Sequence, residues 1–177
     1  MAQPPGIHAR RAALRLLDAV LRRGETLDVA FGAATSDIRK FEDKALARAI
    51  ASETLRWLVD LDALIDSATR QNLPDDAKAR QVLRLMLAQW LRLGTPPHAV
   101  VATGLPLLSG GPRRLAHGVF STLTKREAKL PDTPTLPAAV AARWGERASG
   151  IAEGLAERGN LRPRIQATQI GGLVVLL

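Results

Sequence analysis

The sequence predicts an all-α fold, and three features of its composition support this. Leu, Ala and Arg dominate the chain, and all three residue types favour helices. Hydrophobic residues make up 46% but aromatic residues only 3%, so a core of Leu, Ala, Val and Ile is expected. Apart from the last few residues, the chain has no alternating β-branched run from which a sheet could form. Its 177 residues suffice for one helical domain and a short appendage.

Apolar residues three and four apart predict the helices of the first half. The first helix should run from His8 to about Arg23, where Gly24 stops it. A short helix should cover 27–34. From 42 to 70 the pattern is helical throughout. That length is unusual for one helix of a globular protein, so we expect a break near Asp60.

Proline and glycine mark the helix boundaries in the second half. After a connector at 72–76, the next helix should extend to Leu93 and end at Gly94. Thr95 is expected to cap the following helix through its hydroxyl, with two prolines in the first turn, where a missing N–H is harmless. Pro106 should end or kink that helix.

A loop is predicted at 109–112, followed by a helix from Arg113 to about Lys129. Three prolines within seven residues indicate a linker at 131–137. One more helix, from Ala138 to about Arg158, should precede an irregular tail that offers at most one stray strand.

The formal net charge of +8 is unevenly distributed along the chain. Residues 1–24 carry a net +4, residues 25–76 a net −5, and residues 77–130 a net +8. This segregation predicts that the first helix and the second half form one basic surface. Nucleic acid is the favoured partner and an anionic membrane surface the second choice. The alternative is a generally Arg-rich and Ala-rich proteome in which the charge has no function.

Basic residues cluster on two of the predicted helices, with few acidic residues beside them. Phosphate contact is favoured over an ordinary solvated face for such clusters. The candidate RNA contacts are Arg10, Arg11, Arg15 and Arg22 on the first helix, and Arg113, Arg114, Lys125 and Arg126 on the later one. Trp57 and Trp90 lie on apolar stripes and should be core residues. Without an exposed aromatic pattern, a base-stacking platform is not expected.

Residues for catalysis or for holding a metal or cofactor are not evident. The chain has no cysteine, and its three histidines lack metal-binding spacing. It has neither a nucleophile elbow nor a phosphate-binding loop. The N-terminus lacks the apolar stretch of a signal peptide, and the longest apolar run, GLVVLL, is too short to span a bilayer. We therefore expect a cytoplasmic protein with no metal, no cofactor and no membrane partner.

Three segments of the chain carry a resemblance to a known family. They are HARRAALRLLDAVLRRGETL at the start, then Asp43-Lys44 with Leu55-Arg56 and Leu61-Asp62, and finally LRLMLAQW followed by TPPHAVV. Residues 8–130 thereby resemble the NusB-like RNA-binding domain. The Pro-Pro-His-Ala element is most similar to the N-terminal domain of RsmB-type rRNA cytosine-C5 methyltransferases.

The resemblance implies an orthogonal helical bundle of two three-helix halves, with an extra C-terminal helix in this chain. It also implies binding of RNA, chiefly rRNA, through the basic N-terminal region, with Arg10 and Arg11 as the leading contacts. A ribosomal or transcription-complex protein is a further implied partner. The sequence departs from the family pattern at a few positions in the second half: Thr103, Pro106, Ser121 and Thr124-Lys125.

The C-terminal segment LPAAVAARWGERASGIAEGLAERG resembles the linker helix that leads into a methyltransferase domain. The likeness fails after Asn160, before any cofactor loop or catalytic cysteine. The division expected is a NusB-like domain at 1–130, a linker at 131–137, and a linker helix with an irregular tail at 138–177. No methyl transfer is expected from this chain. The alternatives are a stand-alone NusB-type antitermination factor that binds RNA and a ribosomal protein, and a helical protein–protein module.

Overall fold

A computed structural model describes residues 5–160, 167–170 and 173–176, and the burial of side chains in residues 5–157. It confirms the predicted helical fold. The bundle consists of α1 (Ile7–Leu21), α2 (Leu27–Ala34), α3 (Phe41–Arg56), α4 (Leu58–Ser67), α5 (Lys78–Leu91), α6 (Pro97–Gly104) and α7 (Gly110–Lys125). After it come α8 (Ala138–Trp144), α9 (Ala148–Asn160), and the strands β1 (Ala167–Ile170) and β2 (Leu173–Leu176).

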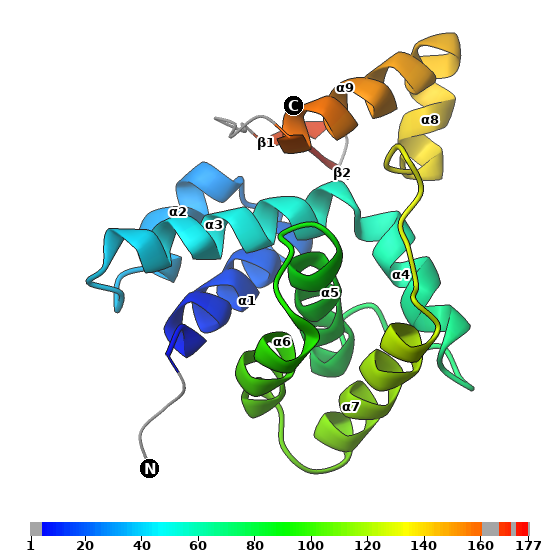
Figure 1. Ribbon diagram of the computed structural model, residues 1–177. Coiled ribbons are helices and arrows are strands. Elements are labelled where there is room, and N and C mark those ends of the chain that lie inside the picture. The colour runs from blue at the N-terminus through cyan, green and yellow to red at the C-terminus, as the bar shows by residue number, and fades with distance from the viewer. Residues whose placement is uncertain (1–4, 161–166, 171–172, 177) are drawn as a thin grey trace.

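Helix α5 lies at the centre of the bundle, between two hydrophobic cores (Figure 1). One core joins α1, α2 and α3, and Leu85 of α5 contributes to it. The other core joins α4 to α7, and Leu83, Met86 and Leu87 of α5 contribute to it. The two-part bundle expected from the resemblance is therefore present, and α4 adds a further helix to the second part. Nearly every residue of α5 is buried because the helix contacts both cores.

The two tryptophans expected in the core differ in their burial. Trp57 is 1% exposed, which confirms the prediction. Trp90 is half-buried at the edge of the second core, where its ring packs edge-on against Phe120 with ring centroids 5.7 Å apart. Phe41, at the start of α3, is 78% exposed, which its sequence context did not indicate.

Several helix boundaries agree with those predicted from the sequence, and others differ from them. Helix α2 has the predicted bounds, and the hydroxyl of Thr26 accepts a hydrogen bond from the Val29 N–H at 3.3 Å. The break in the long helical segment comes at Trp57 instead of Asp60. The prediction that Thr95 caps α6 is wrong, because Pro96 occupies the N-cap position and no side chain caps the helix.

Pro106 lies within a 3-10 turn, Leu105–Leu107, which ends α6 as predicted. The predicted start of α7 at Arg113 is wrong. The helix begins at Gly110, because Pro112 is accommodated in the first turn, where its missing N–H breaks no helical hydrogen bond. Its end is also earlier than expected, at Lys125, so Lys129 lies beyond the helix.

The single helix predicted for 138–158 is interrupted. Gly145 has a φ of 52°, a conformation that favours glycine, and a 3-10 turn over Gly145–Arg147 separates α8 from α9. The tail beyond contains two strands instead of at most one. They pair antiparallel, with Ala167 opposite Leu176 and Ile170 opposite Leu173. A Gly-Gly pair separates them in the sequence, which is typical of a tight hairpin.

Candidate nucleic-acid interface

Arg10, the first of the predicted RNA contacts, points into the bundle instead of toward solvent. The residue is 8% exposed. Its Nε donates to Oε1 of Gln89 on α5 at 2.7 Å, and its Nη1 donates to the Gly6 carbonyl at 3.2 Å. Burial lowers the pKa of Arg10, and the charge of Asp43 offsets part of that effect. Arg10 thus fastens the start of α1 to α5.

Arg10 was predicted as an RNA contact, but it lies on the buried face of α1. Arg10 precedes Ala13 by three residues and Leu17 by seven, and both are fully buried. Three and seven residues separate positions on the same face of a helix. The periodicity itself therefore contained the signal that Arg10 faces the core.

Arg10→Ala should lower the free energy of unfolding by about 1–3 kcal/mol, because it leaves the buried oxygen of Gln89 without its donor. Urea denaturation followed by circular dichroism measures this change. The double variant Arg10→Met with Gln89→Leu removes both polar partners and should recover much of the loss. A cost for Arg10→Ala below about 0.5 kcal/mol would show that the buried contact contributes nothing.

The exposed arginines of α1 already have carboxylate partners. Arg15 makes two hydrogen bonds to Asp37, at 2.8 and 2.9 Å, and a third to the Ala34 carbonyl. The hydrogen bond from Arg15 lowers the pKa of Asp37 to about 2. Arg22 pairs with Asp18 at 3.1 Å. Few acidic residues were expected beside these cations, but the fold supplies carboxylate partners to Arg15 and Arg22.

Arg11 of α1 and Arg23, which follows the C-cap Arg22, are engaged as well. Arg23 pairs with Asp18 at 2.9 Å and with Glu25 at 2.6 Å. Arg11 is half-buried and also has an interaction partner. A phosphate that approached α1 would have to displace carboxylates before it gained these contacts.

The cations of α7, unlike Arg15 and Arg22, have no carboxylate partners within the described residues. Arg113, Arg114 and Lys125 are exposed, and none has an ion pair or a side-chain hydrogen bond within the described part of the chain. Arg126, at the C-cap, donates from Nη1 to the Ser67 carbonyl at 3.3 Å and has no carboxylate partner there. The first turn of α7 contains no acidic residue. This helix therefore presents uncompensated positive charge.

A groove of about 630 Å³ lies between the connector that follows α4 and one face of α7. Ala68 to Pro74 form one wall, and Leu115, Gly118 and Val119 form the other. Arg114 lies four residues before Gly118 and Lys125 seven residues after it, so all three share the face of α7 that flanks the groove. The groove therefore combines an apolar wall with a basic rim.

The connector wall of the groove is polar, and its side chains were missed in the sequence. Thr69, Arg70, Gln71 and Asn72 line it, and the last three are exposed. The sequence pattern assigned Thr69 and Arg70 to the helical segment, which in fact ends at Ser67, and Asn72 to a connector. The run Arg70-Gln71-Asn72 supplies charged and amide hydrogen-bond donors, and this composition could have suggested a nucleic-acid contact. Nothing in the sequence, however, indicated that the run packs beside α7.

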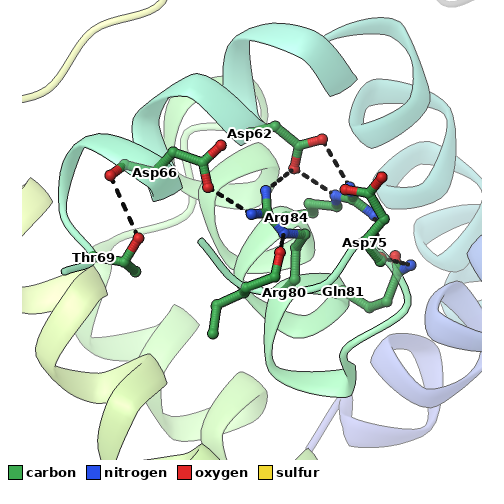
Figure 2. Close-up of polar contacts among 8 residues, drawn as sticks. Asp62, Asp66, Thr69, Asp75, Arg80, Gln81 and Arg84 are labelled. Carbon is green, nitrogen blue, oxygen red and sulfur yellow. Dashed lines mark hydrogen bonds and ion pairs between the residues drawn. The ribbon is translucent and has the colours of Figure 1, made fainter. Parts of the chain in front are cut away.

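Two buried arginines and their half-buried carboxylate partners hold this connector in place (Figure 2). Arg84 donates to both carboxylate oxygens of Asp62, each at 2.7 Å. Arg80 donates to Asp62 at 3.0 Å and to Asp66 at 2.5 Å. Burial by itself would lower the pKa of Arg80, but its hydrogen bonds to Asp66 and Asp62 outweigh burial and raise it.

The same arginines also hold the connector through its backbone. Nε of Arg80 donates to the Leu73 carbonyl at 2.9 Å, and Nη1 of Arg84 donates to the Asp75 carbonyl at 3.2 Å. Gln81 donates to the Asp75 carbonyl as well, at 3.1 Å. The acidic middle segment thus neutralises basic residues of α5, so the charge segregation along the chain reflects internal pairing in part.

The two groups of candidate contacts lie apart in the fold. Figure 1 shows α5 and α6 between α1 and α7. Arg15, Arg22 and Arg23 line a pocket of about 470 Å³ but are paired with carboxylates, whereas Arg114 and Lys125 lie on the α7 face that flanks the groove. Within the described residues, the exposed cations of α7 therefore form no ion pair, in contrast to Arg15 and Arg22.

Comparison with known proteins gives one match. The NusB family matches residues 7–107, more than half of the chain. Neither the curated proteins nor the solved structures returned a match. In the part that the structure describes, no helix is long and apolar enough to span a bilayer. Helix α7 follows the matched region but contributes Ala116, Val119, Phe120 and Leu123 to the second core, so it is part of the same bundle. On this match, the chain belongs to the NusB family.

Proposed function

We propose that this chain is an rRNA-binding module of the type found in rRNA cytosine-C5 methyltransferases, acting in the cytoplasm. Membership of the NusB family indicates an RNA-binding, antitermination-type function, and the NusB domain is non-catalytic. The observation that carries the proposal is the set of uncompensated cations on α7 beside a polar groove. Phosphates are the ligands that such a surface attracts most strongly.

In this proposal the RNA backbone lies along α7. Arg113, Arg114, Lys125 and Arg126 contact phosphates, which position the RNA without reading its sequence. The exposed side chains of Gln71 and Asn72 in the groove can donate to and accept from base edges of unpaired nucleotides.

The cations of α1 have a secondary role. Arg11, Arg15 and Arg22 join the interface by exchanging partners with phosphates. Arg10 supports the interface indirectly, because its guanidinium holds α1 against α5.

Two features favour the methyltransferase type over a stand-alone antitermination factor. The Pro-Pro-His-Ala element begins α6, and the helices α8 and α9 follow the bundle. The family match over 7–107 supports the stand-alone factor equally well, with a ribosomal protein as its second partner. A methyltransferase reading frame next to this one in the genome would favour the first type, and its absence the second.

Binding to rRNA fragments should weaken steeply as salt rises, since each cation that neutralises a phosphate releases a condensed counterion. Four α7 contacts predict a slope of about −3 in a plot of log affinity against log salt concentration. Fluorescence anisotropy with labelled fragments between 50 and 300 mM KCl gives that slope. An affinity that stays constant over this range would refute the electrostatic proposal.

A further inference from the structure

The proline-rich segment after α7 is packed along α4 and is not a free tether. We name residues 128–137 the strap. The chain enters it through Glu127, whose φ of 50° lies in the left-handed region. Ala128 and Leu130 pack against the second core, and Pro134 is buried. Figure 1 shows the strap running from the end of α7 past α4 to α8.

The turn into the strap has defined hydrogen bonds. The N–H of Ala128 donates to the Leu123 carbonyl and the N–H of Glu127 donates to the Thr124 carbonyl, both at 3.1 Å. This is the Schellman pattern, which closes the end of a helix and sets the direction of the chain that leaves it. The direction in which the strap starts is therefore determined by α7.

Asp60 holds the far end of the strap with both of its carboxylate oxygens. Oδ2 accepts a hydrogen bond from the backbone N–H of Thr135 at 2.8 Å, and Oδ1 accepts one from the Thr135 hydroxyl at 2.6 Å. Asp60 is 8% exposed and forms no ion pair within the described residues. Hydrogen bonds to a carboxylate are stronger than those between neutral groups, and two from one residue also define an orientation.

Helix α4 connects this contact to the groove. Asp60 lies in its first turn, and Ser67, its last residue, accepts the hydrogen bond from Arg126 of α7. The connector wall of the groove begins at Ala68, directly after α4. Ten helical residues span about 15 Å and behave as one rigid rod. The groove and the far end of the strap are therefore attached to opposite ends of the same rod.

We propose that Asp60 and Thr135 form a clamp that fixes α8 and α9 at a set position relative to the α7 groove. The three prolines of the strap limit its conformations further, and Val140 of α8 is buried where the strap ends. The functional meaning rests on the proposed RNA binding: RNA held in the groove lies at a constant distance from α9.

The clamp can be tested by a distance measurement between α7 and α9. The chain has no cysteine, so His117→Cys and Glu153→Cys introduce two unique, exposed sites for spin labels. Pulsed electron paramagnetic resonance should give one narrow distance distribution for the parent. Thr135→Val, which removes the hydroxyl donor, and Asp60→Ala, which removes both acceptors, should broaden that distribution at least twofold.

Thr133→Val is the matched control. Thr133 lies two residues away in the strap and makes no hydrogen bond within the described part of the chain, so its replacement should leave the distribution narrow. Thermal unfolding of each variant checks that the bundle remains folded. Thr135 is exposed, so its replacement keeps the test valid even if Asp60→Ala unfolds the bundle.

Two results would overturn the clamp: a broad distribution in the parent, or an unchanged distribution in folded Thr135→Val and Asp60→Ala. RNA affinity measured on the same variants should stay within twofold of the parent, because the clamp lies away from the groove. The distance readout needs no RNA. Loss of salt-dependent binding in the parent would therefore refute the proposed function alone.

Discussion

Asp62→Ala should destabilise the protein by about 3–5 kcal/mol, the loss typical of removing one partner of a buried ion pair. Arg80 and Arg84 are 2% and 3% exposed, and Asp62 is the carboxylate that both of them contact. Removal of Asp62 leaves Arg84 with only the carbonyl and the distant, exposed carboxylate of Asp75. Urea denaturation followed by circular dichroism measures the change in the free energy of unfolding.

Asp37→Ala is the matched control for this variant, because it also removes a carboxylate that an arginine contacts with two hydrogen bonds. The side chains of Arg15 and Asp37 are each 44% exposed, and exposed pairs contribute only about 0–1 kcal/mol. Equal losses for the two variants would contradict the assignment of Asp62 to a buried network.

A second control separates the effect of an unpaired charge on stability from the effect of lost packing around Asp62. A triple variant that replaces Asp62, Arg80 and Arg84 with apolar residues of similar size should be far more stable than Asp62→Ala, since no buried charge is left unpaired. It should also bind RNA more weakly than the parent. Arg80 and Arg84 hold the connector by the carbonyls of Leu73 and Asp75, and that connector forms one wall of the groove.

Much of the helical fold could be predicted from the sequence because helix periodicity and helix ends are local properties. Gly24 and Gly94 have φ values of 68° and 66°, and each follows a helix that was predicted to end there. The break at Trp57 was displaced by three residues, because it depends on how Trp57 is buried and not on a proline or glycine. Tertiary packing decided that boundary.

The partners of the charged residues could not be predicted in the same way. Arg15 and Asp37 are 22 residues apart in the chain, as are Arg84 and Asp62. Only the packing of separate helices brings such residues together. In the sequence, the acidic segment 25–76 only contrasts with the basic segments on either side of it. In the fold, its carboxylates pair with basic residues on α1 and α5.

The sequence likewise indicated one part of the candidate site and not the other. The cations of α7 were evident in the sequence as a local cluster on one predicted helix. Arg70, Gln71 and Asn72 were not identified, because a groove exists only where the connector packs beside α7. The resemblance favoured Arg10 and Arg11 on α1, but the burial of Arg10 shifts the proposed phosphate contacts to the other side of the bundle.

Replacement of Arg113 and Arg114 by Glu should weaken RNA binding on the order of 100-fold at about 100 mM salt, since it removes two charge-assisted contacts and adds two repulsive charges. The slope of log affinity against log salt should become shallower by roughly 1.5. Both side chains are exposed and unpaired in the described chain, so the free energy of unfolding should change by less than about 0.5 kcal/mol.

The matched control reverses the charge of two neighbouring arginines at the C-terminal end of α1. Arg22 and Arg23 are also exposed, but Asp18 and Glu25 already neutralise them, so Arg22→Glu with Arg23→Glu should weaken binding less than fivefold. Anisotropy titrations of both double variants against the same rRNA fragment decide between the two faces. A larger loss for the α1 variant would place the interface on α1, as the family resemblance implied, and would refute the assignment to α7. A loss that is uniform across fragments of different sequence would further identify these arginines as phosphate contacts, because contacts to base edges would discriminate between sequences.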